Sequence, residues 1–252
     1  MMLILKILSY IFLVLLVLEL IYIAFVILSS LIVNTSKDYT KNSKYFRGLL
    51  YSGTWELLLF GRVKVHITGA EKLPKDSRFL IISNHRSKFD PMTTWYVFRK
   101  YNIAYISKPE NFNVPFFGRI IRPCCFLPII RGNPRLALPT IEKAIDLLKA
   151  DEVSIGIYPE GTRSQTEEML PFHNGVFKIA QRAEVPVVIC AVQGTEKIHK
   201  NFPWRKTHVY IDVLDVIPVE KLLTQKTFEI ADYSKAVIEK KLNESKNNQQ
   251  AG

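Results

Sequence analysis

The chain has 252 residues, of which 48% are apolar, and its formal net charge is +11. One domain with an appendage is therefore expected, with a substantial core and a basic surface that suits nucleic acid or an anionic membrane. No stripe of interleaved basic and aromatic residues is visible, which disfavours a nucleic-acid partner.

The cysteines are two adjacent residues and a distant one: Cys124, Cys125 and Cys190. This pattern forms neither a disulfide framework nor a metal-binding motif, and it agrees with a cytoplasmic domain. We therefore expect the three thiols to serve as small apolar core residues, and we expect no metal site built on them.

An apolar segment over residues 7–33 contains a single charged residue, Glu19. As a helix it would be ~40 Å long at ~1.5 Å per residue, enough to cross a bilayer with tilt. The apolar run exceeds the core of an ordinary signal peptide and no clean cleavage site follows, so a membrane anchor is favoured over a cleaved signal. Basic residues are scarce before the segment (Lys6) and frequent after it, which places the rest of the chain on the cytoplasmic side of the cell membrane.

Residues 45–60 form the second predicted helix, because apolar side chains recur there at helical spacing. Two interpretations are open: an interfacial helix with Arg47 and Trp55 at the headgroup level, or the first helix of the globular core. In the first case both helices could lodge in one leaflet. Apolar residues at about −0.3 to −0.6 kcal/mol each outweigh the cost of about 2.5–3.5 kcal/mol for Glu19, so insertion is expected either way. The length of the first segment and its lopsided basic flanks favour spanning.

From residue 62 onward, short apolar runs alternate with amphipathic segments. The apolar runs predict strands over residues 63–67, 79–82, 103–106, 124–130, 153–158, 185–192 and 208–213. The other segments predict helices over residues 92–101, 112–121, 138–148, 175–182 and 228–242. This alternation predicts an α/β fold with a mixed sheet and helices on both faces. We expect a membrane anchor over residues 1–60, a globular domain over 61–242 and a disordered polar tail over 243–252.

A histidine and a carboxylate follow the strand predicted over residues 79–82. His85 lies in the turn after this strand, and Asp90-Pro91 is typical of a helix start with Asp90 as its N-cap. The carboxylate could hold one ring N–H of His85, which would leave the other nitrogen basic and able to take a proton from a hydroxyl. Taken alone this spacing is common by chance, and Asp90 could be only a cap beside an ordinary loop histidine.

A second polar loop follows the strand predicted over residues 153–158. It combines a flexible backbone, hydroxyl donors and a planar cation suited to phosphate, supplied by Gly161, Thr162, Ser164 and Arg163. Because an acid repels phosphate, Glu160 is expected to orient Arg163 or to accept a hydrogen bond from a substrate hydroxyl. Arg131 follows a third predicted strand. Each loop alone could be solvated, but strand ends are where α/β sheets bind ligands, so together they predict proton abstraction from a hydroxyl near an anion.

The spacing Asn84-His85-x4-Asp90, followed further along by Tyr158-Pro159-Glu160-Gly161-Thr162-Arg163-Ser164, resembles the 1-acylglycerol-3-phosphate acyltransferases. The resemblance implies that His85 is the general base, that Asp90 orients it and that Arg131 binds the phosphate of the acceptor. It also implies an acceptor-binding loop made of Glu160, Gly161, Thr162, Arg163 and Ser164. An acyl site lined by Pro186 and Val187 is implied as well.

The reaction implied by this resemblance transfers a fatty acyl group from acyl-CoA or acyl-ACP to the 2-hydroxyl of 1-acylglycerol 3-phosphate, giving phosphatidic acid. The implied partners are a lysophospholipid acceptor, an anionic membrane and, for one of the two donors, acyl carrier protein. No metal, bound cofactor or covalent enzyme intermediate is implied, because His85 activates the hydroxyl directly.

Some residues depart from the family pattern. Arg86 stands where glutamine is more usual, Tyr158 replaces phenylalanine, and Ile130 precedes Arg131 where an acid is frequent. Another lysophospholipid or glycerol 3-phosphate is therefore an alternative acceptor. A non-catalytic protein that binds anionic lipid is an alternative of another class, which explains the charge and the apolar helix but not the His85–Asp90 pair. The sequence leaves open the donor, the acyl-chain length and the oligomeric state.

Overall fold

A seven-stranded sheet forms the centre of the computed structural model, which describes residues 1–166 and 168–250. Its strands are β1 (Val63–Thr68), β2 (Leu80–Ser83), β3 (Ala104–Ser107), β4 (Leu127–Pro128), β5 (Ile155–Ile157), β6 (Val187–Gln193) and β7 (Thr207–Ile217). They lie in the order β1-β7-β6-β2-β5-β3-β4, and β6 and β7 form the antiparallel pair among otherwise parallel neighbours. The predicted mixed α/β sheet is confirmed.

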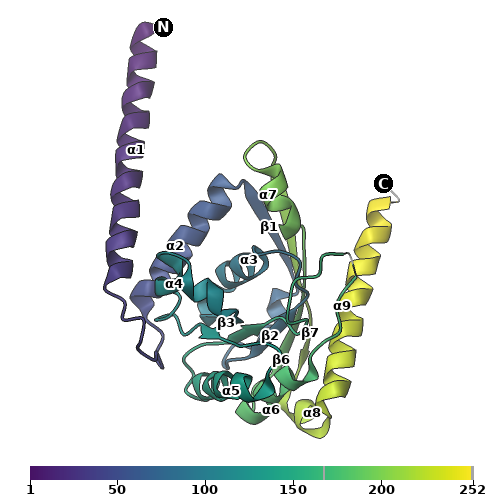
Figure 1. Ribbon diagram of the computed structural model, residues 1–252. Helices are drawn as coiled ribbons and strands as arrows, with labels where there is room; N and C mark the ends of the chain where they lie inside the picture. Colours follow the sequence, from purple (N-terminus) through teal and green to yellow (C-terminus); the bar gives the residue numbers. More distant parts are fainter. Residues whose placement is uncertain (167, 251–252) are drawn as a thin grey trace.

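Helices cover both faces of this sheet (Figure 1). On one side lie α2 (Lys44–Phe60), α3 (Asp90–Val97) and α4 (Phe117–Ile120), and on the other α5 (Pro134–Lys149), α6 (Lys178–Ala183) and α9 (Thr227–Gln250). The short helices α7 (Ile198–Asn201) and α8 (Val219–Thr224) lie in the connections on either side of β7. Because β2 is central and covered on both faces, its residues are continuously apolar and buried and do not alternate.

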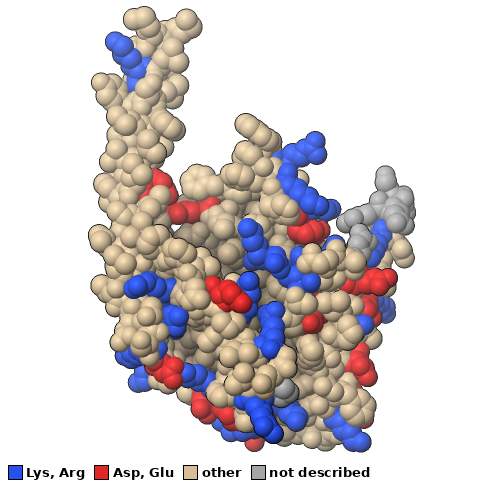
Figure 2. Space-filling view, in the orientation of Figure 1, with Lys and Arg blue, Asp and Glu red and all other residues tan. Residues whose placement is uncertain are grey.

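The N-terminal helix α1 (Met2–Leu31) projects from the body of the protein (Figure 1). Within the described ranges it is the one helix that is long and apolar enough to cross a membrane, and Ser29 and Ser30 are its buried residues. Figure 2 shows its free half almost without charged side chains. By length and composition, therefore, α1 can serve as a membrane anchor.

The C-terminal half of α1 runs alongside α2. The hydroxyls of Tyr22 and Ser52 are 2.7 Å apart, and those of Ser29 and Tyr45 are 2.6 Å apart. The inner face of α2 is buried against the domain, while Trp55, Leu59 and Phe60 on α2 are exposed. The helix therefore packs on the core, as one interpretation predicted, and keeps an apolar outer face, as the other required.

A buried arginine joins α2 to the domain. Arg47 is 3% exposed, and its guanidinium donates to the Asn42 side-chain oxygen at 2.9 Å, to the Ile103 carbonyl at 2.8 Å and to the Cys124 carbonyl at 2.6 Å. Its place in the core shows that it is not the exposed headgroup contact that the interfacial interpretation assigned to it. The predicted division of the chain between residues 60 and 61 stays a prediction.

Three segments differ from the sequence-based prediction. β4 covers only Leu127–Pro128, because the chain turns at Cys125, whose φ of 61° lies outside the strand region. α5 begins at Pro134, where the Asn133 side chain caps it, so Pro139 lies inside the helix. α9 continues to Gln250, so the tail predicted to be disordered from residue 243 is helical up to that point. Its inward face reaches the end of β6, where Gln193 donates to the Ser245 hydroxyl at 3.1 Å. Residues 251 and 252 lie outside the described part.

The three cysteines are buried free thiols, as predicted. Burial raises the pKa of the Cys124 thiol to about 11 and that of the Cys125 thiol to about 12. At neutral pH both groups therefore stay protonated and behave as apolar core atoms.

Candidate functional site

The strand directions bring the predicted site residues to one edge of the sheet. β2, β3, β4, β5 and β6 are mutually parallel, so their carboxyl ends meet at a single edge. The loops after these five strands carry, in turn, His85, Lys108, Arg131, Glu160 and Thr195. This edge is where open α/β sheets place ligands.

His85 and Asp90 form a hydrogen-bonded pair at the centre of this edge. The His85 Nδ1 atom lies 2.9 Å from the Asp90 Oδ2 atom, and the two side chains are 13% and 1% exposed. Because a carboxylate can only accept, Nδ1 carries the proton, and Nε2 is left with a lone pair. The imidazole can therefore take a proton from a bound hydroxyl.

Asp90 is held by four donors and does not cap α3. Its Oδ2 atom also accepts from the backbone N–H groups of Arg86 and Ser87, each at 2.8 Å, and its Oδ1 atom accepts from the Thr195 hydroxyl. The N-cap position belongs to Phe89, which makes no side-chain capping bond. The prediction of an Asp90 cap was wrong because the carboxylate turns back onto the preceding loop.

The rings of Tyr158 and Tyr105 stack in turn against one face of the His85 imidazole. The His85 ring lies 3.9 Å from that of Tyr158, centroid to centroid, and the Tyr158 ring lies 5.4 Å from that of Tyr105. The stack rests on Gly156, where an added Cβ would approach the Tyr105 ring to 2.6 Å. Burial raises the pKa of both tyrosines well above the ordinary value, so both remain neutral and serve as packing surfaces.

Glu160 holds the backbone of the histidine loop. It is 3% exposed, and its carboxylate accepts from the N–H of His85 at 2.7 Å and from the N–H of Leu170 at 2.9 Å. Burial raises the pKa of this carboxyl group, and the two N–H donors oppose the rise. The expected bond to Arg163 is replaced by these two, because the side chain turns inward toward β2.

The rest of the second loop divides between structural and exposed residues. Ser164 is buried, its N–H donates to the His85 carbonyl at 2.9 Å, and its hydroxyl bonds to carbonyls of its own loop. Gly161 has a φ of +70°, and an added Cβ would come within 2.9 Å of the His173 ring. Thr162 and Arg163 are exposed at the edge, where they can meet a substrate.

Two further cations lie along the edge beyond β5. Arg131 follows β4, three strands from β2, which corresponds to ~14 Å at the usual strand spacing. Partial burial lowers the pKa of its guanidinium, while nearby Glu110 opposes the shift. Lys108 follows β3, between Arg163 and Arg131, and the sequence analysis did not identify it as a site residue. Its place directly after an apolar strand could have indicated this role.

Pro186 and Val187 are not brought to His85. Val187 pairs with Leu80 at the opposite end of β2 and β6 and is fully buried, and the Pro186 carbonyl accepts from the Leu80 N–H. Asn84 does belong to the site framework, because its amide exchanges two hydrogen bonds of 2.8 Å with the backbone of Val192. This bond pair fixes the histidine loop to the end of β6.

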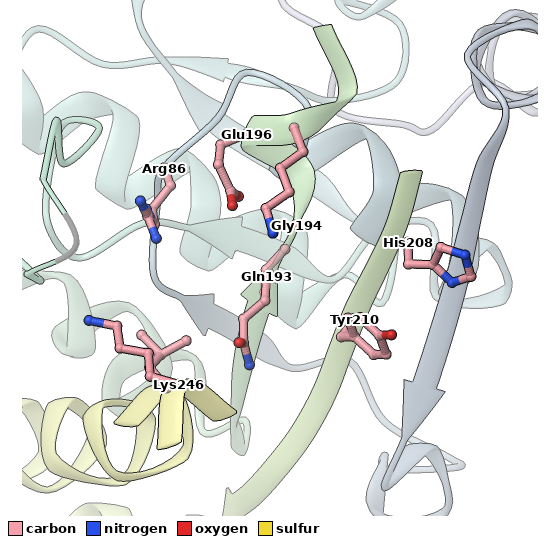
Figure 3. Close-up of a pocket in the computed structure, with 10 residues that line it drawn as sticks. Arg86, Gln193, Gly194, Glu196, His208, Tyr210 and Lys246 are labelled. Carbon is pink, nitrogen blue, oxygen red and sulfur yellow. The ribbon is translucent and has the colours of Figure 1, made fainter. Parts of the chain in front are cut away.

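A cavity of about 150 Å³ lies beside the histidine loop, at the carboxyl end of β6. Figure 3 shows Arg86, Glu196 and Lys246 around it, from three different elements, with Gln193 between Glu196 and Lys246. Lys197, His208 and Tyr210 also line it. The excess of cations and its proximity to His85 suit an anionic group of about phosphate size.

A family model described as Acyltransferase matches residues 64–193, just over half of the chain. A 1-acyl-sn-glycerol-3-phosphate acyltransferase of Bacillus subtilis is 37% identical over 138 residues, 55% of this chain and 66% of that protein. The Escherichia coli protein of the same name is 29% identical over 169 residues, 66% of this chain and 67% of that protein. The chloroplastic protein BAT2 of Brassica napus, also so named, is 35% identical over 54% of this chain and 39% of its own length.

Among solved structures, the chain is similar to the 1-acyl-sn-glycerophosphate acyltransferase PlsC of Thermotoga maritima. The TM-score is 0.63 over 90% of this chain and 89% of that one, with 23% sequence identity. This likeness shows a common fold. The chain spans 66%, 67% and 39% of the lengths of these three curated relatives, and the family match covers the loops that carry His85 and Glu160.

Proposed function

The chain belongs to the acyltransferase family, and we propose that it transfers a fatty acyl group from an acyl thioester to the 2-hydroxyl of 1-acylglycerol 3-phosphate. The product would be phosphatidic acid. The observation that carries the proposal is the His85–Asp90 pair, in which the buried carboxylate keeps the proton on Nδ1 and leaves Nε2 as the base.

The proposed reaction proceeds by one proton relay through His85. Nε2 takes the proton of the acceptor hydroxyl as the hydroxyl oxygen attacks the thioester carbonyl carbon. Asp90 stabilises the imidazolium that forms. The tetrahedral intermediate then collapses, the carbon–sulfur bond breaks, and the leaving thiolate takes the proton from Nε2. The chain thus returns to its starting state with an ester and a free thiol as products.

The acceptor phosphate would be bound along the edge between β5 and β4. Arg163 lies nearest to the histidine loop, and Lys108 and Arg131 follow at the ends of β3 and β4. A planar guanidinium can bind two phosphate oxygens at once, which suits Arg163 and Arg131 to this task. Thr162 adds an exposed hydroxyl. Acyl-CoA and acyl-ACP are the two proposed donors, and both end in a thioester.

Membrane attachment through α1 is part of the proposal. The helix is ~45 Å long at ~1.5 Å per residue, and its N-terminal half is exposed and apolar. The larger number of basic residues after α1 than before it supports a cytoplasmic catalytic domain. A lysophospholipid acceptor would then diffuse to the enzyme within the membrane.

The test is an acyl-transfer assay with the purified full-length protein in lipid vesicles. Labelled acyl-CoA and acyl-ACP are each offered with 1-acylglycerol 3-phosphate, other lysophospholipids and glycerol 3-phosphate. We expect labelled phosphatidic acid, and at least ~10²-fold less of it with His85→Ala. Faster transfer to another acceptor would replace the proposed substrate. Equal transfer by His85→Ala and the unmodified protein would refute the proposed chemistry.

A further inference from the structure

The segment between β6 and β7 lies against the end of α2. The Arg62 side chain donates to the Trp204 carbonyl at 2.9 Å, and the Arg62 carbonyl accepts from the Thr207 N–H at 3.1 Å. These bonds join residues 198–206 to the junction of α2 and β1, although the two segments are far apart in the chain. Figure 1 shows α7 and the loop after it beside the upper end of α2.

Both segments expose large apolar side chains. Trp204 is 84% exposed and Phe202 is 54% exposed, and at the end of α2 Trp55, Leu59 and Phe60 are 50%, 53% and 60% exposed. We call these five residues the aromatic patch. Large exposed apolar patches rimmed by polar residues mark sites that bind proteins or membranes.

The exposure of Trp204 comes from an ordered turn. Ile198 is buried and accepts from the Phe202 N–H at 3.1 Å, and the Asn201 carbonyl accepts from the Arg205 N–H at 2.7 Å. The Asn201 amide also donates to the Thr207 hydroxyl at 3.0 Å. Phe202 and Trp204 are therefore held outward by a bonded backbone.

The surroundings of the patch are basic. Residues 55–68 and 198–210, which contain the patch, have one acidic residue, Glu56, and five Lys and Arg residues: Arg62, Lys64, Lys200, Arg205 and Lys206. Figure 2 shows Lys and Arg side chains over α7. Tryptophan beside lysine and arginine is the combination found at the interface between a membrane and water, where the cations attract anionic lipids.

The patch also lies at the membrane end of the molecule. α1 and α2 run in opposite directions, since Ser29 meets Tyr45 and Tyr22 meets Ser52. The free half of α1 therefore extends beyond the C-terminal end of α2, which is the end that carries Phe60 (Figure 1). A bilayer that holds the free half of α1 would meet the aromatic patch at its surface.

We propose that the aromatic patch is a second membrane contact, which binds the surface of an anionic phospholipid bilayer. This inference rests on the membrane attachment in the proposed function and deepens it. The contact also bears on catalysis. Gln193 at the end of β6 pairs with Tyr210 near the start of β7, so the connection that carries Phe202 and Trp204 lies at the carboxyl end of β6. The patch and the His85 edge thus lie at the same end of the sheet, and the contact turns that edge toward the lipid that holds the acceptor.

Tryptophan fluorescence tests the proposal on the full-length protein. The chain has three tryptophans, and Trp95 is 2% exposed and donates to the Thr54 hydroxyl. The variant Trp55→Phe leaves Trp204 as the exposed reporter, and Trp55→Phe/Trp204→Phe leaves only Trp95. Each is bound to vesicles of phosphatidylcholine and phosphatidylglycerol, with or without brominated acyl chains. We expect the brominated lipid to quench Trp204 and membrane binding to shift its emission to the blue. Equal fractional quenching of the two variants would overturn the proposal.

A charge-reversal variant tests the preference for anionic lipid. In the Trp55→Phe protein, the added substitutions Lys200→Glu/Arg205→Glu/Lys206→Glu should abolish the quenching of Trp204 by brominated anionic vesicles. The matched control Lys75→Glu/Lys149→Glu/Lys240→Glu makes the same change in net charge at exposed lysines away from the patch and should keep it. Equal behaviour of the two variants would overturn the anionic preference. Co-sedimentation of each variant with the vesicles reports separately on the proposed anchor: protein that stays in the supernatant would show that membrane attachment itself fails. Neither readout needs turnover, so acyl transfer is judged independently.

Discussion

The Glu160 carboxylate accepts a hydrogen bond of 2.7 Å from the backbone N–H of His85, the proposed catalytic base. This bond joins the histidine loop to the loop after β5, and the second contact of Glu160, to the Leu170 N–H, holds the carboxylate within its own loop. Ser164 completes the joint by donating to the His85 carbonyl. The two sequence motifs therefore form one rigid unit, in which the second motif positions the backbone of the first.

Glu160→Gln should lower turnover and stability together. An amide N–H would face one of the two backbone N–H donors, which costs about 1–3 kcal/mol for an unsatisfied buried group. We expect kcat to fall and the apparent KM for the acyl donor to change little. The measurement is steady-state kinetics beside denaturant unfolding. Unchanged kcat in a folded Glu160→Gln protein would contradict a positioning role.

The same carboxyl group gives a pH dependence of stability. Burial raises its folded-state pKa above the ordinary value of 4.5, so its contribution to stability is fully present below that pH and is lost as pH rises through the folded pKa. Wild type should therefore lose stability relative to Glu160→Gln as pH rises above 4.5. Thermal unfolding of both proteins across this range measures the difference. A difference in melting temperature that stays constant with pH would show that Glu160 does not titrate in this way.

Substitution of the catalytic pair should separate chemistry from folding. His85→Ala should reduce acyl transfer by ~10²–10⁴-fold, the usual contribution of a positioned base, with little loss of stability. Asp90→Asn should reduce both acyl transfer and stability. Its N–H₂ group would replace a carboxylate oxygen that accepts hydrogen bonds and would face donor groups instead. Kinetics and unfolding of each variant check this contrast. If Asp90→Asn kept wild-type stability, the four-donor arrangement would not be the one in solution.

The edge cations should affect the acceptor and not the donor. Arg163→Lys should raise the apparent KM for 1-acylglycerol 3-phosphate about tenfold, because a fork that binds two oxygens becomes a point charge. The position of Arg131, three strands from β2, predicts a smaller rise for Arg131→Lys. Arg182→Lys, at an exposed ion pair with Glu142, serves as the control and should change neither KM. A rise in the donor KM alone would reverse the assignment of this edge.

Arg47→Lys should destabilise the junction between α2 and the domain. The guanidinium reaches Asn42, Ile103 and Cys124 from three separate nitrogens, and a single ammonium nitrogen cannot lie close to all three acceptors. Each buried acceptor left unpaired costs about 1–3 kcal/mol. Arg62→Lys is the matched control, because Arg62 also donates to a backbone carbonyl but is exposed, and a small effect is expected there. Unfolding in detergent measures both. Equal losses in the two variants would contradict a special role for Arg47.

The sequence by itself determined the features that depend on neighbours along the chain. The apolar run of residues 79–82 predicts a central strand because it is covered on both faces, and the spacing of His85 and Asp90 is short enough for one turn to bring them together. The apolar composition of α1 likewise follows from its own residues. Such features need no knowledge of strand order.

Tertiary structure decided everything that depends on which strands become neighbours. β5 lies next to β2, and this turned Glu160 from an expected partner of Arg163 into a support for His85. Two strands, β5 and β3, separate β4 from β2 and so set the distance of Arg131 from His85. The antiparallel pairing of β6 and β7 placed Trp204 at the end of the molecule that carries the site. Strand order is chosen by the packing of the whole core, and no local pattern contains that choice.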